Sequence, residues 1–437
     1  MDSDVEWKDL SLGEVIELKR GYDLPKDKRM PGSVPIVSSS GVSDFHSEAM
    51  VKGPGVVTGR YGTIGEVFYV EGDYWPLNTT LYVRDFKGND SRFISYFLRT
   101  LDFQAYSDKG AVPGLNRNHL HLAKVRLPGK NVQKSIATVL SSLDSKIDLN
   151  CSINQTLEAV AQAIFKSWFV DFDPVKAKIA AKAEGHDPLR AAMSTISGKP
   201  DAELDTLSPE QYEQLAATAA LFPDDVEESE LGNIPRGWAV RALPDCIDVN
   251  PSRSLKKGTV ALYLDMANVS TNSARVRNIV AREFSSGSKF QNGDTLLARI
   301  TPCLENGKTA FVDFLNGDDI GWGSTEFIVL RSKIGLPESF AYFLCRDPEF
   351  RAFAIAQMAG TSGRQRVPND CFGNYKLVEP AEPVAAEFGR LAGAALGQIK
   401  ALDLEAKTLA SLRDTLLPKL LSGELSVEAL AEQAGIA

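Results

Sequence analysis

The second half of this 437-residue chain repeats the first half at a nearly constant offset. Tyr96-Phe97-Leu98 recurs as Tyr342-Phe343-Leu344, and Gly114-Leu-Asn-Arg117 recurs as Gly363-Arg-Gln-Arg366. From Pro128 onward the offset is 252 (380 − 128), and it continues through Ile147 and Ile399. A period of roughly 250 residues is far longer than a solenoid repeat. The sequence therefore predicts two copies of one module, each a domain followed by a long helix.

Length and composition are those of an ordinary globular protein of about three compact units, at about 150 residues each. We find no apolar run long enough to span a bilayer and no signal-peptide pattern, which predicts a cytoplasmic protein with no membrane association. The net charge is −9, which is unfavourable for a nucleic-acid binder. However, residues 174–231 alone hold 5 Lys and Arg against 12 Asp and Glu, a net of −7 (5 − 12). Any DNA affinity therefore depends on a local basic face or on a partner.

Six segments follow from the pattern of short β-branched strands, periodic helices and linkers. They are a first domain (1–130), a long helix (131–173), an acidic linker (174–231), a second domain (232–380), a second long helix (381–423) and a tail (424–437). Pro174 is expected to end the first long helix, and Pro418 to bend the second. Ser208 is expected to cap a helix within the acidic linker. The predicted fold class is α+β: two mixed domains separated by two long antiparallel helices that form a coiled-coil spacer.

Both long helices carry a heptad seam of alternating steps of four and three. The first seam reads Ile136, Leu140, Leu143, Ile147, Asn150, Asn154, Leu157, Ala161, Ile164 and Trp168. The second reads Phe388, Ala392, Ala395, Ile399, Leu402, Ala406, Leu409, Arg413, Leu416 and Leu420. Large residues in one copy often match small ones in the other, as paired helices require. Each helix of ~40 residues would extend about 60 Å. Two ordinary amphipathic helices on separate domains are the alternative.

Several catalytic signatures are missing. Gly307-Lys308-Thr309 resembles the end of a phosphate loop, but Pro302 occupies the place of the leading glycine. His119 and His121 have no third ligand nearby for a zinc ion. The sequence contains neither the Asn-Pro-Pro-aromatic loop expected of an amino-methylating enzyme nor a Gly-x-Ser-x-Gly nucleophile motif. We therefore expect no catalysis, no metal and no cofactor in this chain.

Polar loops with glycines recur at matching places in both copies and provide the candidate DNA-binding residues. In the first copy these are Arg60, Tyr61, Thr63, Asn78, Thr79, Lys109, Asn116 and Arg117. In the second copy they are Arg299, Thr301, Ser324, Thr325, Thr361, Arg364, Gln365 and Arg366. Arginine can form two hydrogen bonds with guanine, Asn and Gln can do so with adenine, and hydroxyl groups suit phosphates. A single such loop is more simply a solvated connector, but three loop pairs favour DNA recognition.

The helical motifs resemble those of the specificity subunits of type I restriction–modification systems. The resemblance covers nearly the whole chain and is closest in Gln133-Lys-Ser-Ile-Ala137, Leu140-Ser-Ser-Leu-Asp144-Ser-Lys-Ile147, Ala161-Gln-Ala-Ile-Phe165-Lys-Ser-Trp168, Gly232-Asn-Ile-Pro-Arg-Gly-Trp238 and Leu412-Arg-Asp-Thr-Leu-Leu-Pro418. The second helix departs from the pattern, because Ala385-Ala-Glu-Phe388 replaces the polar opening of the first.

The resemblance implies two target-recognition domains that each read one half of a bipartite double-stranded DNA site. The paired helices would then set the spacing and dock two methyltransferase subunits, with restriction or translocase subunits as further partners. S-adenosylmethionine, and ATP with Mg²⁺ if a nuclease subunit is present, would belong to those partners. Two other classes stay open at this stage: a self-contained DNA-modifying enzyme and a scaffold that does not bind DNA.

Overall fold

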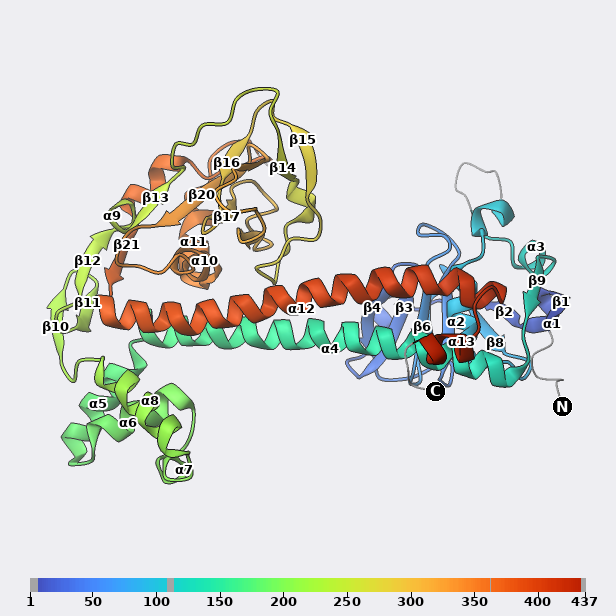
Figure 1. The fold of residues 1–437 in the computed structure, drawn as a ribbon, viewed down its shortest axis with the longest axis horizontal. Helices are drawn as coiled ribbons and strands as arrows, with labels where there is room; N and C mark the ends of the chain where they lie inside the picture. The colour runs from blue at the N-terminus through green and yellow to red at the C-terminus, as the bar shows by residue number, and fades with distance from the viewer. Residues whose placement is uncertain (1–6, 108–113, 362, 434–437) are drawn as a thin grey trace. The chain divides into compact units, whose positions relative to one another are not determined.

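The computed structural model describes residues 7–107, 114–361 and 363–433 of the chain. Two compact units are formed, one by the residues up to 149 together with those from 405 onward, and the other by residues 150–404. Each unit contains one strand-rich domain and a part of each long helix (Figure 1). This arrangement confirms the predicted α+β class.

Two small sheets form the strand-rich domain of the first unit. The first sheet is antiparallel, in the order β2 (Glu17–Arg20), β8 (Thr80–Asp85), β5 (Gly55–Gly59) and β6 (Val67–Val70). The second has the order β4 (Gly41–His46), β3 (Val34–Ser38) and β7 (Trp75–Pro76), with β3 parallel to β7. A separate pair, β1 (Lys8–Ser11) and β9 (Lys124–Leu127), joins the first and last strands of the domain. The helical elements are α1 (Leu12–Val15), η1 (Lys26–Lys28), α2 (Ser91–Arg99), η2 (Phe103–Tyr106) and α3 (Arg117–His121).

The domain of the second unit has the same strand orders. They are β13 (Ile247–Val249), β20 (Phe327–Ser332), β17 (Thr295–Ala298) and β18 (Thr309–Phe311), then β15 (Val280–Glu283), β14 (Val260–Leu264), β19 (Gly321–Gly323) and β16 (Ser288–Phe290). Strand β14 is parallel to β19, and β12 (Ala239–Ala242) pairs with β21 (Lys376–Glu379) as β1 pairs with β9. The helical elements are α9 (Leu243–Cys246), η3 (Met266–Asn268), α10 (Phe340–Arg346), α11 (Pro348–Ala356) and η4 (Asn369–Asn374). The repeat in the sequence is thus a repeat of topology, to which the second copy adds β16.

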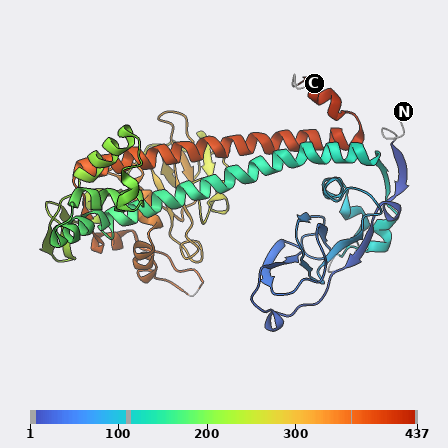
Figure 2. The ribbon, with the colours of Figure 1, turned by 90° about the horizontal axis from the view of Figure 1, so that it is seen from below.

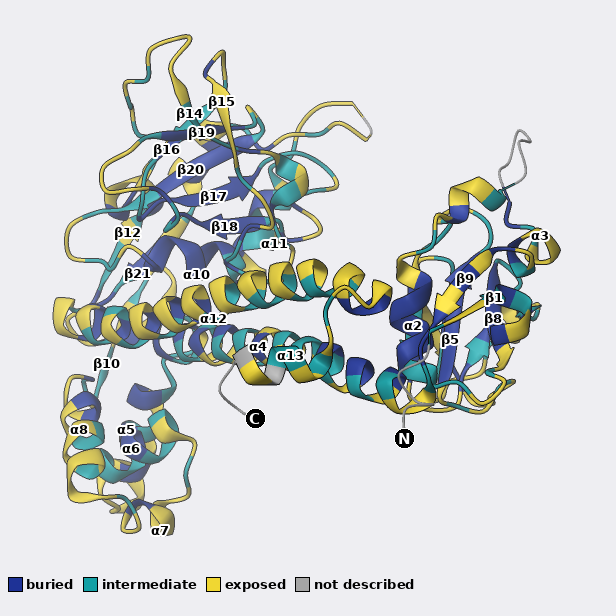
Figure 3. Ribbon diagram, turned by 45° about the vertical axis from the view of Figure 1, so that its right-hand side comes forward, coloured by how far each residue is buried: buried dark blue, intermediate teal, exposed yellow. Residues whose placement is uncertain are grey.

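A short helix covers the four-stranded sheet in each domain and explains why its central strand is buried. In the first domain α2 begins where the Asp90 carboxylate accepts a hydrogen bond from the Phe93 backbone N–H at 2.8 Å. Helix α2 then packs against β5 and β6, as α10 does against β17, β18 and β20. Strands β5 and β17 are buried along their whole lengths (Figure 3). An N-cap of this kind satisfies a backbone N–H that the first helical turn would otherwise leave unpaired.

The two long helices, α4 (Lys130–Phe169) and α12 (Glu382–Ser422), lie side by side within each unit (Figures 1 and 2). In the second unit Asn150 Nδ2 donates to the Leu402 carbonyl at 3.5 Å, and the rings of Phe165 and Phe388 are 5.6 Å apart. Residue numbers rise along one helix as they fall along the other, so the pairing is antiparallel, as predicted. All residues of both predicted seams are buried or half-buried. Helix α12 continues through Pro418 to Ser422.

An acidic side chain of α4 holds each domain to the helices of its own unit. In the first unit the Tyr96 hydroxyl and an Arg413 guanidinium N–H each donate to the Asp144 carboxylate at 2.6 Å. In the second unit Glu158 accepts from the Tyr342 hydroxyl and, at 2.9 Å, from the Ala274 backbone N–H. Tyr96 and Tyr342 occupy matching places in the repeated Tyr-Phe-Leu motif. Burial, followed by the neighbouring carboxylate, raises the pKa of each tyrosine, so both are neutral donors.

Two expectations for residues 170–231 are wrong. Pro174 does not end α4, which stops at Phe169; it instead lies in the first turn of α5 (Asp173–Glu184). Proline fits that place because the backbone N–H groups of the first turn have no acceptor within the helix, so a residue without an N–H loses no hydrogen bond there. The acidic segment is also more than a linker, because α5, α6 (Pro188–Ser197), α7 (Asp201–Leu204) and α8 (Pro209–Ala220) form a helical subdomain. Its own small core is Ala192, Met193, Leu204 and Ala219.

The ends of this segment and of the chain are short elements. Ser208 caps α8 by accepting from the Gln211 backbone N–H at 3.3 Å, as predicted. The hairpin of β10 (Val226–Ser229) and β11 (Gly232–Pro235) then leads into the second domain. The tail forms α13 (Val427–Gln433).

Candidate nucleic-acid interface

Three loops of the first domain meet at the end of β5. The Arg60 and Tyr61 backbone N–H groups donate to the Thr79 carbonyl at 2.9 and 3.2 Å. The Leu115 N–H donates to the Arg60 carbonyl at 3.0 Å, and Tyr61 pairs with Gly114 as an isolated bridge. Backbone hydrogen bonds therefore join the three predicted loops into one continuous surface.

Side chains of the first surface are held in different ways. The Arg60 guanidinium lies over the Tyr61 ring at 4.5 Å, and the Asn78 amide donates to the Asp23 carboxylate. Asn116 caps α3 by accepting from the Asn118 N–H at 3.0 Å, which places Arg117 exposed in the first turn of that helix. Thr63 is exposed, and the Thr79 hydroxyl is buried. Lys109 lies outside the described residues.

The second domain brings its three predicted loops together through the same backbone bonds. The Arg299 N–H donates to the Glu326 carbonyl at 2.9 Å, and the Val367 N–H donates to the Arg299 carbonyl at 2.9 Å. Ile300 pairs with Arg366 as an isolated bridge. Thr301 also fixes the third loop, because its hydroxyl accepts from the Gln365 N–H at 3.1 Å. The loops thus share one frame in both copies.

Two arginines of this second surface already have partners. An Arg299 Nη2 donates to the Val367 carbonyl at 2.6 Å. The Arg366 guanidinium binds both oxygens of the Glu326 carboxylate at 2.7–3.0 Å, which lowers the pKa of Glu326. The other candidates here are Ser324, whose hydroxyl accepts from the Glu326 N–H, and the exposed Thr325, Thr361 and Arg364.

One correspondence between the copies, Arg117 with Arg366, is wrong by three residues (252 − 249). The N–H of Leu115 and that of Val367 make the same hydrogen bond, so Gly114 corresponds to Arg366 at the offset of 252 (366 − 114). Arg117 therefore corresponds to Asn369, and both are the first residues of their helices, α3 and η4. The glycine is required in the first copy because a Cβ there would lie 2.4 Å from the Tyr61 ring.

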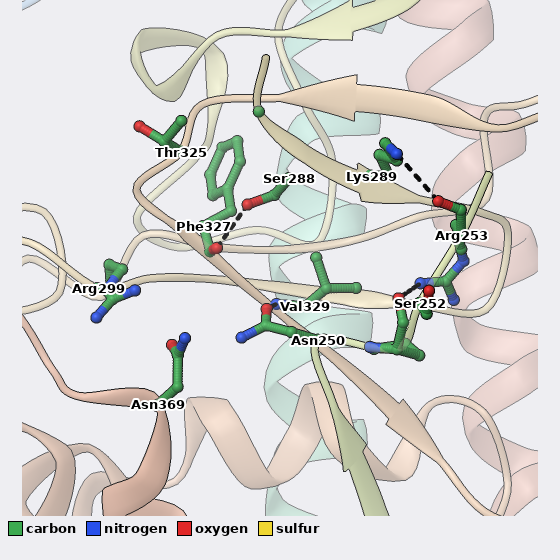
Figure 4. Close-up of a pocket in the computed structure, with 12 residues that line it drawn as sticks. Asn250, Ser252, Arg253, Ser288, Lys289, Arg299, Thr325, Phe327, Val329 and Asn369 are labelled. Atoms are coloured by element: carbon green, nitrogen blue, oxygen red, sulfur yellow. Dashed lines mark hydrogen bonds between the residues drawn. The ribbon is translucent and has the colours of Figure 1, made fainter. Parts of the chain in front are cut away.

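A groove of about 450 Å³ opens in the second domain beside the loop surface (Figure 4). It contains two predicted residues, Arg299 and Thr325. Its other polar and charged lining residues are Asn250, Ser252, Arg253, Ser288, Lys289 and Asn369, which sequence reasoning missed. The signal available was the polar run Asn250-Pro-Ser-Arg253 directly after a strand, but the first copy has no similar run.

A buried ion pair lies beneath this groove. Arg253 Nη2 is 2.6 Å from Asp294 Oδ1, and Arg331 Nη1 is 3.0 Å from the same oxygen. The Asp294 side chain has no exposed surface, and that of Arg253 is 5% exposed. Burial raises the pKa of Asp294 and lowers that of Arg253, against their mutual attraction. The pair fixes the wall of the groove rather than presenting a free charge.

The part of the chain that the structure describes offers neither a metal site nor a membrane-spanning helix. The described residues contain no group of three or more His, Cys, Asp or Glu side chains placed to hold a metal ion. None of the helices described is long and apolar enough to cross a membrane. His121 is used in the fold, where its Nε2 accepts from the Leu18 backbone N–H at 3.0 Å.

Known proteins resemble this chain in sequence and in fold. Residues 4–159 match the type I restriction modification DNA specificity domain. The HindI type I restriction enzyme specificity subunit of Haemophilus influenzae is 29% identical over 338 residues, which cover 74% of this chain and 73% of that protein. The MjaIX specificity subunit of Methanocaldococcus jannaschii is 23% identical, over 98% of this chain and 88% of its own.

A solved structure has the same fold. The crystal structure of the type I restriction–modification S subunit of M. genitalium aligns with a TM-score of 0.54 and 13% identity, and covers 96% of this chain and 97% of its own. Residues 4–159 thus carry a type I restriction modification DNA specificity domain, and the whole chain is similar in sequence and fold to the specificity subunits of type I restriction–modification systems.

Proposed function

We propose that this chain reads a bipartite, asymmetric site in double-stranded DNA, with residues 1–130 recognising one half and residues 232–380 the other. The observation that carries the proposal is the shared loop frame, in which Arg60, Thr79 and Leu115 make the same backbone bonds as Arg299, Glu326 and Val367. A frame repeated with different side chains suits one task on two different sequences, because base edges are distinguished by side-chain donors and acceptors.

The long helices have a separate role in this proposal. They act as an antiparallel spacer and dock two methyltransferase subunits, and restriction or translocase subunits join when present. S-adenosylmethionine and ATP with Mg²⁺ bind those partners, and the complex works in the cytoplasm. This chain contributes recognition without catalysis. Incubation of the pure chain with DNA and S-adenosylmethionine is expected to give no methyl incorporation, and robust incorporation would contradict this part.

The DNA-facing side chains proposed are the loop residues named from the sequence, foremost Arg60 and Arg117 in the first domain and Arg299, Arg364 and Arg366 in the second. An arginine that reads guanine should cost about 1–3 kcal/mol at one base pair when replaced by alanine. A phosphate-binding arginine should instead weaken all sequences alike and flatten the salt dependence. If none of the five alanine variants changes affinity or specificity in the assembled complex, these loops are connectors.

The decisive experiment maps methylated bases in the host genome with and without this gene. We expect one two-part motif to lose methylation when the gene is removed. Exchange of residues 232–380 for the equivalent part of a relative should then change one half of the motif and leave the other half intact. Loss of no motif would reject the proposed function, and a change in both halves would reject the division of labour between the domains.

A further inference from the structure

The groove of the second domain presents hydrogen-bond donors from three separate elements. Figure 4 shows Arg299, Asn369 and Asn250 near one end of it, and they come from the end of β17, from η4 and from the segment after β13. Arg253 in the lining is neutralised by Asp294, but the lining also holds the cationic Lys289 and Arg299 and no acidic residue. Such a lining favours a ligand that carries negative charge or acceptor atoms.

The backbone holds the side chain of Asn250 in a fixed orientation, with its oxygen bonded to the neighbouring strand. The Asn250 backbone N–H donates to the Val329 carbonyl at 2.7 Å, and its Oδ1 accepts from the Val329 N–H at 2.9 Å. Its φ of 51° is a left-handed conformation that Asn tolerates better than most residues. Because Oδ1 is already used, the side-chain NH₂ is the group left to bind in the groove.

Arg299 is oriented in a comparable way. One Nη2–H donates to the Val367 carbonyl, and Nε is buried without a partner among the described residues. This contact fixes the plane of the guanidinium and leaves Nη1 for a ligand. Asn369 is exposed as the first residue of η4 and lines the same groove. The backbone thus fixes two of the three donors before any ligand arrives, which reduces the entropy lost on binding.

The same three places carry donors in the first domain. Val249 pairs with Leu330 in the second domain, and Leu18 pairs with Val83 at the equivalent place in the first. The residue that follows in each strand direction is Asn250 in the second domain and Lys19 in the first, so these two residues are equivalent. The loop frame matches Arg60 with Arg299, and the corrected offset matches Arg117 with Asn369. All three positions therefore carry hydrogen-bond donors in both domains. The donors are Lys19, Arg60 and Arg117 in the first domain and Asn250, Arg299 and Asn369 in the second.

We propose that this groove binds an acceptor-bearing group of the second half-site through Asn250, Arg299 and Asn369. The group is either the O6 and N7 edge of a guanine or a phosphodiester oxygen, since both offer only acceptors. This inference rests on the proposed function, because DNA is the ligand.

The test uses the complete complex with its methyltransferase subunits and the target duplex found by methylation mapping. Asn250→Asp keeps the bond to the Val329 N–H and the tolerance of a positive φ, but replaces the donor by an acceptor. Asn369→Ala removes the exposed amide. Asn374→Ala is the matched control, because Asn374 is the exposed last residue of the same short helix and does not line the groove. Thermal unfolding of each variant excludes loss of the fold.

Each of the two groove variants should weaken cognate binding by roughly tenfold, the effect of a typical base contact, while the control leaves it unchanged. Relaxed discrimination at one base pair of the second half, reproduced by 7-deazaguanine at that position, identifies a guanine edge. Uniform weakening with a flatter salt dependence, reproduced by a single methylphosphonate linkage, identifies a phosphate oxygen. Folded groove variants that bind and methylate like the control would overturn the inference. Failure of the wild-type complex to recognise any sequence would instead overturn the proposed function.

Discussion

The two recognition domains share a backbone frame but fill its interior with different chemistry. Tyr82 and Val329 occupy equivalent places, because they pair with Val57 and Leu296 at the same point of the sheet. Around Tyr82 the first domain has further tyrosines, and the hydroxyls of Tyr22 and Tyr82 are 2.9 Å apart. Around Val329 the second domain has the buried ion pair of Arg253 and Asp294 and the open groove.

This difference separates what specifies the fold from what varies between copies. Main-chain hydrogen bonds of the strands and loops are alike in the two domains, and they depend little on side-chain identity. The interior side chains are then free to differ, provided that each set satisfies its own polar groups. An aromatic filling tolerates the loss of a hydroxyl, whereas an ionic filling tolerates poorly the loss of one charge.

The largest effect should come from breaking the ion pair. Asp294→Ala leaves Arg253 buried without a carboxylate and should cost about 3–5 kcal/mol of the unfolding free energy of the second domain. Tyr22→Phe in the first domain removes one hydroxyl contact and should cost about 1 kcal/mol. Urea unfolding of the full chain measures both. Equal losses for the two variants would show that the interiors do not differ in the way described.

The next effect concerns the attachment of each domain to the helices of its unit. Glu158→Ala leaves the Tyr342 hydroxyl and the Ala274 N–H without an acceptor, and should cost about 2–4 kcal/mol. Asp144→Ala should cost about 1 kcal/mol, because water can replace a carboxylate that is 22% exposed. Thermal unfolding of both variants, with Gln155→Ala as an exposed control on the same helix, provides the measurement. A larger loss for Asp144→Ala would reverse this ranking.

A smaller effect tests the corrected register. Gly114→Ala places a methyl group against the Tyr61 ring and should cost about 1–2 kcal/mol. In a protein that already carries Tyr61→Ala, adding Gly114→Ala should lower the unfolding free energy much less, because the ring it would contact is gone. Arg366→Ala, at the equivalent position of the second domain, should change unfolding by less than about 0.5 kcal/mol. If Gly114→Ala were as neutral as Arg366→Ala, close packing would not explain the glycine.

The smallest effect is a pH dependence confined to the second domain. The Arg366 guanidinium lowers the pKa of Glu326 below its ordinary value of 4.5. A carboxyl with a lowered pKa in the folded state adds stability above its ordinary pKa and loses it as pH falls through the lowered value. Because both side chains are partly exposed, solvent screens their attraction and the contribution is small. Arg366→Ala should therefore make stability less sensitive to pH as the pH falls below the ordinary pKa of Glu326, and Arg364→Ala should leave this slope unchanged.

Much of the fold could be predicted because its signals are local. The heptad seams predicted the two long helices, because two positions in every seven residues must be apolar to face a partner helix. Repeated apolar runs separated by Gly and Pro gave strand-rich domains. The acidic segment was misjudged because its four helices are short and Ala-rich, and their small core leaves only a weak periodic signal.

The candidate site was less predictable because it depends on residues that are distant in sequence. The three loops could be named, and they do meet in each domain. Asn250 and Asn369 could not be named, because they are about 120 residues apart (369 − 250 = 119) and are brought to one groove by the pairing of β13 with β20 and by the bond from the Val367 N–H to the Arg299 carbonyl. Two loops also share the sequence Gly-x-x-Arg, which suggested that Arg117 corresponds to Arg366. The backbone hydrogen bonds do not support that correspondence.

The pairing of β1 with β9 and of β12 with β21 has an evolutionary consequence. Because the first strand of each domain is hydrogen-bonded to its last strand, the two ends of the domain lie next to each other. A gene segment cut at the codons for these strands therefore encodes a whole domain, from its first strand to its last. Recombination at such junctions replaces one recognition domain by another in a single event, while the gene segments for the long helices are unchanged.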